Sequence, residues 1–456
     1  MNFGKLENFI FEKMSDTHLP GLSVAAIMDG NVVYSRGFGF RNLQYGLGAT
    51  RNTLYGIGSV TKSFTALAIM QLVEKGKLGL DDPISKHLSI DLKAREKPVQ
   101  IRHLLSHTSG IPALAYAEAL IRYVTKADDK WIPVSGHDDV LTFMNNAEQW
   151  ALARPGERWF YLNEGYLLLG YIIEKVFKLS YREYIIKKIL EPLQMKSSYF
   201  KKEEVEKNPE VATPYVITRD GDCLESRYTY GPLSSDGGLI SNVSDLTNYL
   251  RMYIERGAVK DTALVSRESM EAMEKPRIDL PLQVFPGEAY GFGLHIIPDF
   301  FGNKLIGHGG SVLVSTAYIG YLLKKRIGIA LLANGSGYPM SQLGLYGLAL
   351  MCGEEPEELP FVKIERTFER LEGKYETYKG TMKAQVVSNA GILNLEIKDK
   401  YMDLIIPLIP ENLENDVKHF YTVQSGVKLP VEFMVSGDNV DLIYERYRLR
   451  KVGTPT

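Results

Sequence analysis

The chain has 456 residues, of which 45% are hydrophobic and 24% charged, and its 53 basic side chains nearly balance its 55 acidic ones. This length exceeds what one hydrophobic core usually serves, so two or more domains are expected. The composition excludes a disordered or fibrous chain, and a net charge of -2 gives no overall field for nucleic acid or an anionic membrane. Two cysteines, Cys223 and Cys352, exclude a disulfide-rich scaffold and a cysteine-rich zinc ribbon, with a single disulfide between them the less favoured alternative.

The first twenty residues lack the basic head, apolar core and small-residue cleavage site of a secretory signal. The apolar runs around residues 166–173 and 312–323 are shorter than the roughly 20 residues that cross a bilayer. We therefore expect a cytoplasmic protein without a membrane or nucleic-acid partner.

The predicted elements run from strands through helices back to strands. Residues 22–27 and 31–34 are β-prone runs around Asp29-Gly30, which is a hairpin signal. Residues 59–75 predict a helix that is apolar nearly all round and so belongs in the centre of its domain. Further helices are predicted at 166–177 and 245–254, and strands at 291–297, 304–306, 312–322 and 326–333. This order favours one sheet whose first and last strands flank an inserted helical region.

A second domain is predicted beyond an acidic, proline-containing interruption at residues 353–360. Short alternating segments separated by turn signals follow it, which is typical of a small antiparallel β-sandwich or barrel. The expected division is residues 1–352, a linker at 353–360, and residues 361–456.

The sharpest chemical signal is Ser59 followed three residues later by Lys62, at the head of the buried helix. Residues three apart share one helical face, so the Ser59 hydroxyl and the Lys62 amine can meet. A lysine beside an apolar helix can have its pKa lowered and act as a base towards a serine nucleophile. The alternative is that Ser59 caps the helix and Lys62 extends to solvent.

Two later segments add polar groups that suit the same chemistry. Tyr161 can relay a proton and Asn163 can orient a lysine and a substrate amide, although Asn163 as a helix cap and Tyr161 as a core residue are alternatives. In Gly307-His308-Gly309-Gly310-Ser311, the glycines allow close approach of a substrate backbone and His308 can donate or carry a proton. The alternative for this segment is a glycine-rich β-bulge with an exposed histidine.

Taken together, Ser59-x-x-Lys62, Tyr161-x-Asn163 and His308-x-Gly310 resemble the signatures of the penicillin-recognising serine hydrolases. The match is to the branch of class C β-lactamases, D-Ala-D-Ala carboxypeptidases, D-aminopeptidases and related esterases. It spans roughly residues 8–350. The resemblance implies an α/β (α+β) fold with an antiparallel sheet flanked by helices and a helical subdomain, and it implies no cofactor and no metal.

The resemblance also implies residue roles. Ser59 would be the acylated nucleophile, with Lys62 as its base, alone or together with Tyr161, and Tyr161 would pass the proton to the leaving group. Asn163 would fix the polar network, His308 would line the wall opposite Tyr161, and the backbone N–H groups of Ser59 and Ser311 would form the oxyanion hole.

One departure from the family pattern concerns the third signature. Many members have a threonine where this chain has Gly309, and its hydroxyl helps to hold a substrate carboxylate. Gly309 lacks that hydroxyl, and His308 is mostly neutral near pH 7 if its pKa is unshifted. This difference argues against β-lactamase or carboxypeptidase as the main activity and favours an aminopeptidase, endopeptidase or esterase.

A rival signal is the pair His103 and His107, whose spacing would suit zinc on one helical face. Neither a glutamate after His103 nor a third ligand is evident, so core or loop-anchoring roles are preferred for both.

The chain beyond residue 361 resembles the lipocalin-like barrel that is appended to several of these hydrolases, including archaeal peptidase homologues. The similarity rests on the layout and on the segment Leu371-Glu372-Gly373-Lys374-Tyr375. Such a domain would bind a ligand, gate the active site or build an oligomer, and substrate restriction or assembly is the preferred role. A homo-oligomer is therefore expected, with a compartment formed through this domain as a further expectation.

The sequence therefore predicts a serine hydrolase that acts through an acyl-enzyme on peptides, including those with D-residues, or on small acyl substrates. An esterase or weak β-lactamase on the same site is the first alternative. A catalytically inert penicillin-binding or sensor module is the second.

Overall fold

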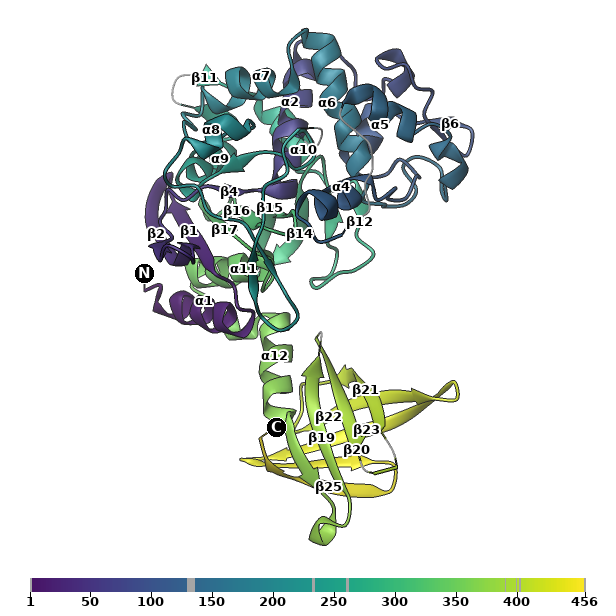
Figure 1. Ribbon diagram of the computed structural model, residues 1–456. Helices are drawn as coiled ribbons and strands as arrows, with labels where there is room; N and C mark the ends of the chain where they lie inside the picture. The colour runs from purple at the N-terminus through teal and green to yellow at the C-terminus, as the bar shows by residue number, and fades with distance from the viewer. Residues whose placement is uncertain are drawn as a thin grey trace. The chain divides into compact units, whose positions relative to one another are not determined.

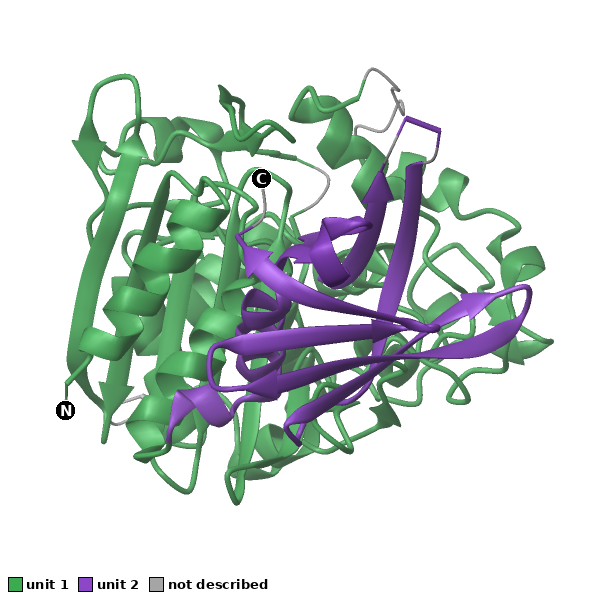
Figure 2. Cartoon of the chain, turned by 90° about the horizontal axis from the view of Figure 1, so that it is seen from below, with its two compact units in different colours: residues 1–354 green, residues 355–456 purple. Residues whose placement is uncertain are grey.

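The computed structural model describes residues 2–128, 136–231, 234–259, 262–389, 391–398, 400–401 and 403–454. Contacts divide the chain into two units, residues 1–354 and 355–456, which Figure 2 distinguishes by colour. The break falls inside the acidic segment 353–360, within which a short helical turn, η5 (Pro356–Glu358), forms, and helix α12 (Pro360–Leu371) begins at its last residue.

Within the described residues, nine strands of the first unit form one antiparallel sheet in the order β12-β13-β14-β15-β16-β17-β1-β2-β3. Strand β1 lies between β17 and β2, so the two ends of the unit meet in the sheet and enclose the helical region in sequence. This confirms the predicted antiparallel sheet with an inserted helical region. The strands are β1 (Gly21–Met28), β2 (Asn31–Asn42), β3 (Leu47–Gly48), β12 (Ile278–Asp279), β13 (Ala289–Tyr290), β14 (His295–Phe300), β15 (Asn303–Ser311), β16 (Thr316–Leu322) and β17 (Ile327–Ala333).

Helices cover both faces of this sheet (Figure 1). Helix α11 packs on β16 and β17 with α1 beside it, whereas α9 packs on β1 and β17 from the other side and α2 lies in the centre of the helical region. The helices are α1 (Gly4–Asp16), α2 (Thr61–Glu74), α3 (Ile101–Leu105), α4 (Tyr116–Val124), α5 (His137–Phe143), α6 (Asn163–Phe177), α7 (Tyr181–Ile185), α8 (Lys202–Glu206), α9 (Val243–Ile254), α10 (Arg267–Met273) and α11 (Met340–Cys352).

Shorter elements connect these helices and strands. The helical turns are η1 (Gly58–Val60), η2 (Ile84–Lys86), η3 (Ala147–Trp150) and η4 (Ile186–Leu190). The small strand pairs are β4 (Tyr55–Gly56) with β9 (Ile240–Ser241), β5 (Lys93–Ala94) with β6 (Lys97–Pro98), β7 (Tyr215–Ile217) with β8 (Cys223–Glu225), and β10 (Ala258–Val259) with β11 (Thr262–Ala263).

The predicted strand 312–322 is two features in the structure. Residues 312–315 form a turn, with Leu313 in the left-handed region at φ 67°, and β16 begins only at Thr316. The glycine-rich segment Gly307–Ser311 is the end of β15, so it is neither a connection between strands nor a bulge.

The described strands of the second unit close an eight-stranded antiparallel barrel, because β18 pairs with both β19 and β25. Its interior is filled by alternate side chains such as Leu395, Leu408, Val431 and Phe433, which are fully buried. The predicted small antiparallel barrel is thereby confirmed. Its elements are β18 (Gly373–Glu376), η6 (Tyr378–Gly380), β19 (Lys383–Asn389), β20 (Ile392–Lys398), β21 (Asp403–Asn412), β22 (Val417–Gln424), β23 (Val427–Ser436), β24 (Asn439–Tyr444) and β25 (Tyr447–Gly453).

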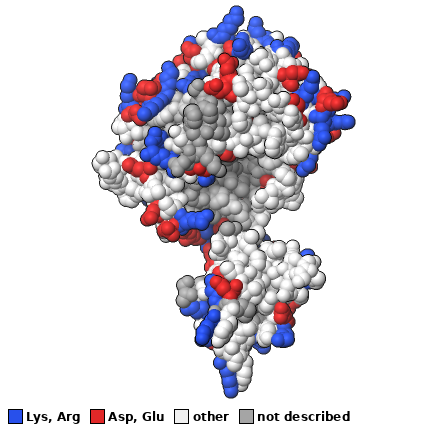
Figure 3. All heavy atoms as spheres, turned by 45° about the vertical axis from the view of Figure 1, so that its right-hand side comes forward, with Lys and Arg blue, Asp and Glu red and all other residues white. Residues whose placement is uncertain are grey.

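Two general features agree with the composition. Charged side chains of both signs are interspersed over the face drawn in Figure 3, and Cys223 and Cys352 are both free thiols. Among the described helices, none is long and apolar enough to cross a membrane.

Candidate active site

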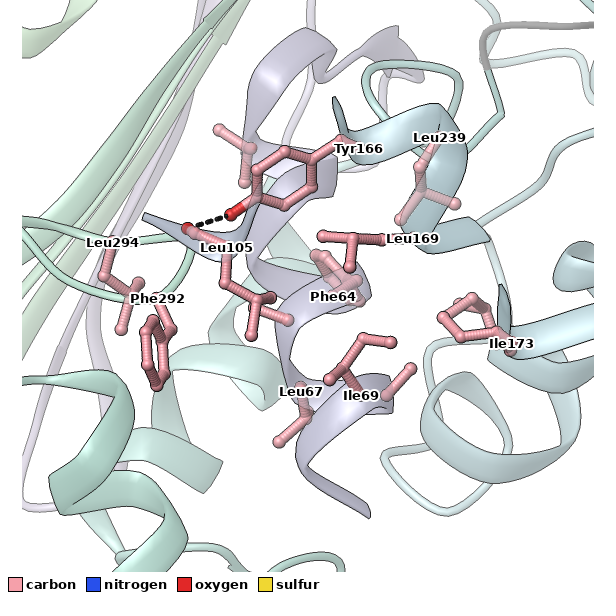
Figure 4. Packing of buried hydrophobic residues seen from close by; sticks show 14 of the residues in the cluster. Phe64, Leu67, Ile69, Leu105, Tyr166, Leu169, Ile173, Leu239, Phe292 and Leu294 are labelled. Atoms are coloured by element: carbon pink, nitrogen blue, oxygen red, sulfur yellow. Dashed lines mark hydrogen bonds between the residues drawn. The ribbon is translucent and has the colours of Figure 1, made fainter. Parts of the chain in front are cut away.

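Ser59 lies in η1, directly before helix α2, and its side chain is partly open to solvent. Helix α2 is buried over nearly its whole length, and Figure 4 shows Phe64, Leu67 and Ile69 of this helix packed among side chains of the surrounding elements. Because close packing on all sides leaves this helix little freedom to rotate or slide, Lys62 in its first turn and Ser59 in the preceding η1 are held at fixed positions.

Lys62 is fully buried and is surrounded by oxygen atoms. Among the described residues, its Nζ lies 3.1 Å from Ser59 Oγ, 2.7 Å from Asn163 Oδ1 and 2.8 Å from the carbonyl oxygen of Asp236. The alternative in which Lys62 extends to solvent is therefore wrong. Asn163, at the start of α6, is also not the helix cap, since Leu162 occupies that position and the Asn163 amide binds Lys62.

Tyr161 contacts the lysine through its ring, whose centroid lies 4.9 Å from Lys62 Nζ. His107 holds this tyrosine in place. Its ring lies 4.1 Å from that of Tyr161, its carbonyl accepts a hydrogen bond from Phe160 N–H (2.8 Å), and its Nδ1 accepts one from Leu162 N–H (3.0 Å). His107 is thus a loop anchor, and burial lowers the pKa of its imidazole well below the usual value, helped by Lys62 and His308.

His308 is buried in β15, and both of its ring nitrogens are engaged. Nδ1 lies 2.5 Å from the Gly309 carbonyl oxygen and Nε2 lies 2.7 Å from the Tyr290 hydroxyl. A carbonyl can only accept, so Nδ1 carries the proton and Nε2 accepts from Tyr290. Burial lowers the pKa of His308 to about 3, although the bond to Gly309 opposes this shift, so the ring is neutral at physiological pH.

The end of β15 packs directly against the segment that carries Ser59. A Cβ atom on Gly310 would lie 2.0 Å from the Ile57 oxygen and 3.0 Å from the Ser59 nitrogen, so only glycine fits there. Val312 N–H bonds to the Ser315 oxygen (3.0 Å), which makes Ser311 and Thr316 a non-hydrogen-bonded pair in the alternating antiparallel ladder. The Ser311 N–H therefore points away from β16, towards the Ser59 segment.

Three carboxyl groups surround the lysine and asparagine. Glu118 of α4 accepts a hydrogen bond from Asn163 Nδ2 (2.9 Å), and the buried Glu164 accepts one from Tyr116 N–H (2.9 Å). Burial raises the pKa of Asp236 to about 7 against the opposing effect of Lys62, and burial likewise raises the pKa of Glu164. The field of Glu118 adds to both increases.

The beta-lactamase family matches residues 6–350, which is most of the chain and includes every residue of this site. The chain belongs to the beta-lactamase family. A second family, the Pab87 octamerisation domain, matches residues 356–450, which lie in the second unit.

Individual proteins are similar to this beta-lactamase family chain over different lengths, and one solved structure spans both units. The solved structure of the octameric penicillin-binding protein homologue from Pyrococcus abyssi is 51% identical and covers 99% of this chain and 100% of its own, with a TM-score of 0.95. Penicillin-binding protein 4* of Bacillus subtilis (strain 168) is 27% identical over 410 residues, which cover 85% of this chain and 86% of that protein. Protein flp of Staphylococcus aureus (strain MW2) is 33% identical over 201 residues; these span 43% of this chain and only 38% of flp. The chain thus has the serine hydrolase fold shared by β-lactamases and penicillin-binding proteins.

Several residues of this beta-lactamase family site carry no signal in the sequence. Asp236 contributes a backbone oxygen, Tyr290 of β13 binds His308 of β15 although β14 lies between these strands, and Glu118 binds Asn163 from a helix 45 residues earlier. No local spacing relates these residues to the three signatures. Asp236 follows two serines and precedes Gly237-Gly238, so it reads in sequence as an ordinary turn residue.

Proposed function

We propose that this chain is a serine hydrolase that acts through an acyl-enzyme on Ser59, with peptides as its principal substrates. The observation that carries the proposal is the position of Lys62 Nζ, 3.1 Å from Ser59 Oγ and bonded to two oxygens that can only accept, Asn163 Oδ1 and Asp236 O. A neutral amine has two N–H groups and one lone pair. Once Lys62 has lost a proton, the two acceptors would take its two N–H groups and the lone pair would be left for the Ser59 hydroxyl proton.

In the acylation step, the Ser59 oxygen attacks the substrate carbonyl carbon as its proton passes to Lys62. The negative charge that develops on the carbonyl oxygen would be stabilised by the N–H groups of Ser59 and Ser311. The first N–H groups of a helix lack acceptors within the helix, and the Ser311 N–H points away from β16. The tetrahedral intermediate then expels the leaving group, which takes a proton, and water later hydrolyses the ester on Ser59.

Tyr161 is the group that we assign to proton transfer towards the leaving group, because its ring packs against Lys62 Nζ and its side chain is partly exposed. In the alternative assignment Tyr161 itself takes the Ser59 proton. Replacement of Tyr161 by phenylalanine separates these roles, because acylation by an activated ester needs little help at the leaving group. A variant that still acylates with such an ester but fails with an amide would place Tyr161 at the leaving group.

The third signature supports a preference for substrates without a terminal carboxylate beside the reacting bond. His308 is neutral with both nitrogens engaged, and Gly309 has no hydroxyl. Neither residue offers a charge or a hydroxyl to the carboxylate of a penicillin or of a peptide C-terminus. We therefore place peptidase activity ahead of esterase or weak β-lactamase activity on the same machinery.

We also propose that the chain is a homo-oligomer assembled through its second unit. The support is the match of residues 356–450 to the Pab87 octamerisation domain and the likeness to an octameric homologue over 99% of the chain. In this division of labour, residues 1–352 carry the hydrolase, residues 353–360 link the two parts, and residues 361–456 form the assembly domain. A compartment formed by that assembly would restrict the size of its substrates.

The experiment that tests the proposed function is labelling of Ser59 followed by intact-mass measurement. Wild type, Ser59→Ala and Lys62→Ala are incubated with a fluorophosphonate probe, a fluorescent penicillin and a panel of D- and L-aminoacyl anilides and esters. We expect one adduct per wild-type chain, located on Ser59, and a loss of hydrolysis of at least about 10³-fold in both variants. Absence of any adduct or turnover in the wild type would instead indicate an inert binding module.

A further inference from the structure

Ser59, Lys62 and Asn163 are joined by successive hydrogen bonds, and Glu118 continues this chain of contacts on the side open to solvent. It is an exposed residue of α4, and its Oε1 accepts a hydrogen bond from Asn163 Nδ2 at 2.9 Å. The other end of the same amide, Asn163 Oδ1, lies 2.7 Å from Lys62 Nζ, which in turn lies 3.1 Å from Ser59 Oγ. A carboxylate is therefore held one asparagine away from the catalytic lysine, at the edge that solvent and substrate can reach.

The charges around this position favour a cation. The Glu118 carboxylate raises the pKa of the buried carboxyl groups of Asp236 and Glu164, in each case in addition to the larger effect of burial. The negative charge of Glu118 thus acts on groups inside the site. On β15, His308 is neutral with both nitrogens engaged and Gly309 has only its backbone to offer.

We infer that Glu118 binds the α-ammonium group of the substrate, so that the enzyme acts on peptides, amides or esters whose reacting acyl group is an amino acid with a free amino group. This inference rests on the proposed acyl transfer to Ser59 and names its substrate class. In such a substrate the ammonium nitrogen is attached to the carbon next to the attacked carbonyl, so it must lie close to the nucleophile. The Glu118 oxygen that does not serve Asn163 accepts one of its N–H groups in a charge-assisted hydrogen bond.

A purely structural role for Glu118 makes a different prediction. If the carboxylate only orients the Asn163 amide, its loss impairs every substrate to the same degree. If it binds the ammonium group, its loss impairs only substrates that have one. Glu118→Gln separates the two roles, because a glutamine oxygen can still accept from Asn163 Nδ2 while the charge is removed.

The test compares alanine p-nitroanilide with N-acetylalanine p-nitroanilide, each as the D- and L-isomer, on the full-length protein. We expect the wild type to prefer the free amine, and Glu118→Gln to lower kcat/KM for it about 10- to 100-fold, the range for a lost charged hydrogen bond. The acetylated substrate should change less than about threefold. The matched control is Glu148→Gln, which removes one exposed carboxylate of the same unit from η3 without touching Asn163.

A second readout needs no turnover. Alaninamide should protect Ser59 from the fluorophosphonate probe better than N-acetylalaninamide does, and Glu118→Gln should abolish the difference. The inference would be overturned by equal loss of activity with both substrates, by a wild type that does not prefer the free amine, or by a lack of selective protection. If the probe still labels Ser59 in these cases, the proposed hydrolase function stands. Failure of Ser59 to react with any probe would refute the proposed function itself.

Discussion

Asp236 accepts a hydrogen bond from Lys62 through its backbone carbonyl, and its own carboxyl group is buried. Burial raises the pKa of this carboxyl to about 7, with Lys62 opposing the shift and Glu164 adding to it. A carboxyl with a folded-state pKa above its unfolded value contributes stability below the unfolded pKa, and this contribution is lost as the pH rises through the folded pKa. Ionisation of Asp236 near neutral pH therefore weakens the fold around the active site.

Asp236→Asn tests this effect, because the amide keeps the shape and the backbone bond but cannot ionise. Between pH 5 and pH 8 the wild type should lose stability relative to the variant, by about 1 kcal/mol or more. The measurement is urea unfolding of both proteins across this range, with the difference plotted against pH. A difference that stays constant with pH would show that Asp236 does not titrate there.

His308 has the opposite pH dependence. Burial lowers its pKa from the usual value of 6.5 to about 3, so between these pH values His308 is protonated in the unfolded chain and neutral in the folded chain. Stability is present above pH 6.5 and falls as the pH drops towards 3, with a slope of about 1.4 kcal/mol per pH unit for each such group.

His308→Gln should therefore reduce the slope of the unfolding free energy against pH on the acid side by about 1.4 kcal/mol per pH unit, which corresponds to one proton. The same substitution should lower the unfolding free energy at pH 7. His18→Gln, which changes an exposed histidine of the same unit, is the matched control. Unfolding free energies between pH 7 and 4 provide the measurement. Identical slopes in wild type and His308→Gln would contradict a neutral, buried His308.

At the scale of elements, the contact between β15 and η1 sets the geometry of the site. Gly310 has no room for a Cβ atom, since the Ile57 oxygen would lie 2.0 Å away, whereas the nearest atom to a Cβ on its neighbour Gly309 would be 3.9 Å away. The strand therefore approaches the Ser59 segment through one glycine and leaves the adjacent one open.

Gly310→Ala should push β15 and η1 apart, lower the unfolding free energy by about 1–3 kcal/mol and reduce the rate of Ser59 acylation by at least about 100-fold. Gly309→Ala is the control and should change both quantities little. Thermal unfolding and acylation by the fluorophosphonate probe measure the two effects. An active Gly310→Ala protein would show that this contact does not form the oxyanion hole.

The elements also show what can be read from the chain and what cannot. Ser59 and Lys62 are neighbours by helical spacing, so their meeting was predictable. The glycine-rich segment of β15 was harder, since Gly307 and Gly310 are small because backbones of other segments press on them, and this removes the alternating side chains that signal a strand. Glu118, Asp236 and Tyr290 reach the site only through tertiary folding, which no local pattern records.

At the scale of the whole molecule, the two units have separate hydrophobic cores. The cluster that surrounds α2 and α6 is drawn from the first unit, and the one that fills the barrel comes from residues 368–449. Each unit therefore buries its apolar side chains within its own core.

A chain ended after Glu354 should fold and still acylate Ser59 at a rate within about threefold of wild type, because η1, α2, α6 and β15 all lie in the first unit. The same truncation should abolish assembly and admit larger peptides. Light scattering gives the mass in solution, and a ladder of peptide substrates gives the size limit. An unchanged number of chains per particle and unchanged size selectivity would refute the proposed role of the second unit.

The pairing of β1 with β17 has a consequence for how the molecule is made. Residues 22–28 pair with residues 327–333, which are synthesised much later, and Ser311 follows Ser59 by some two hundred and fifty positions. Such distant pairing delays folding until most of the unit has been synthesised. In the proposed mechanism, Ser59 would leave the ribosome long before the strand that completes the oxyanion hole, so hydrolysis would begin only once the unit is finished.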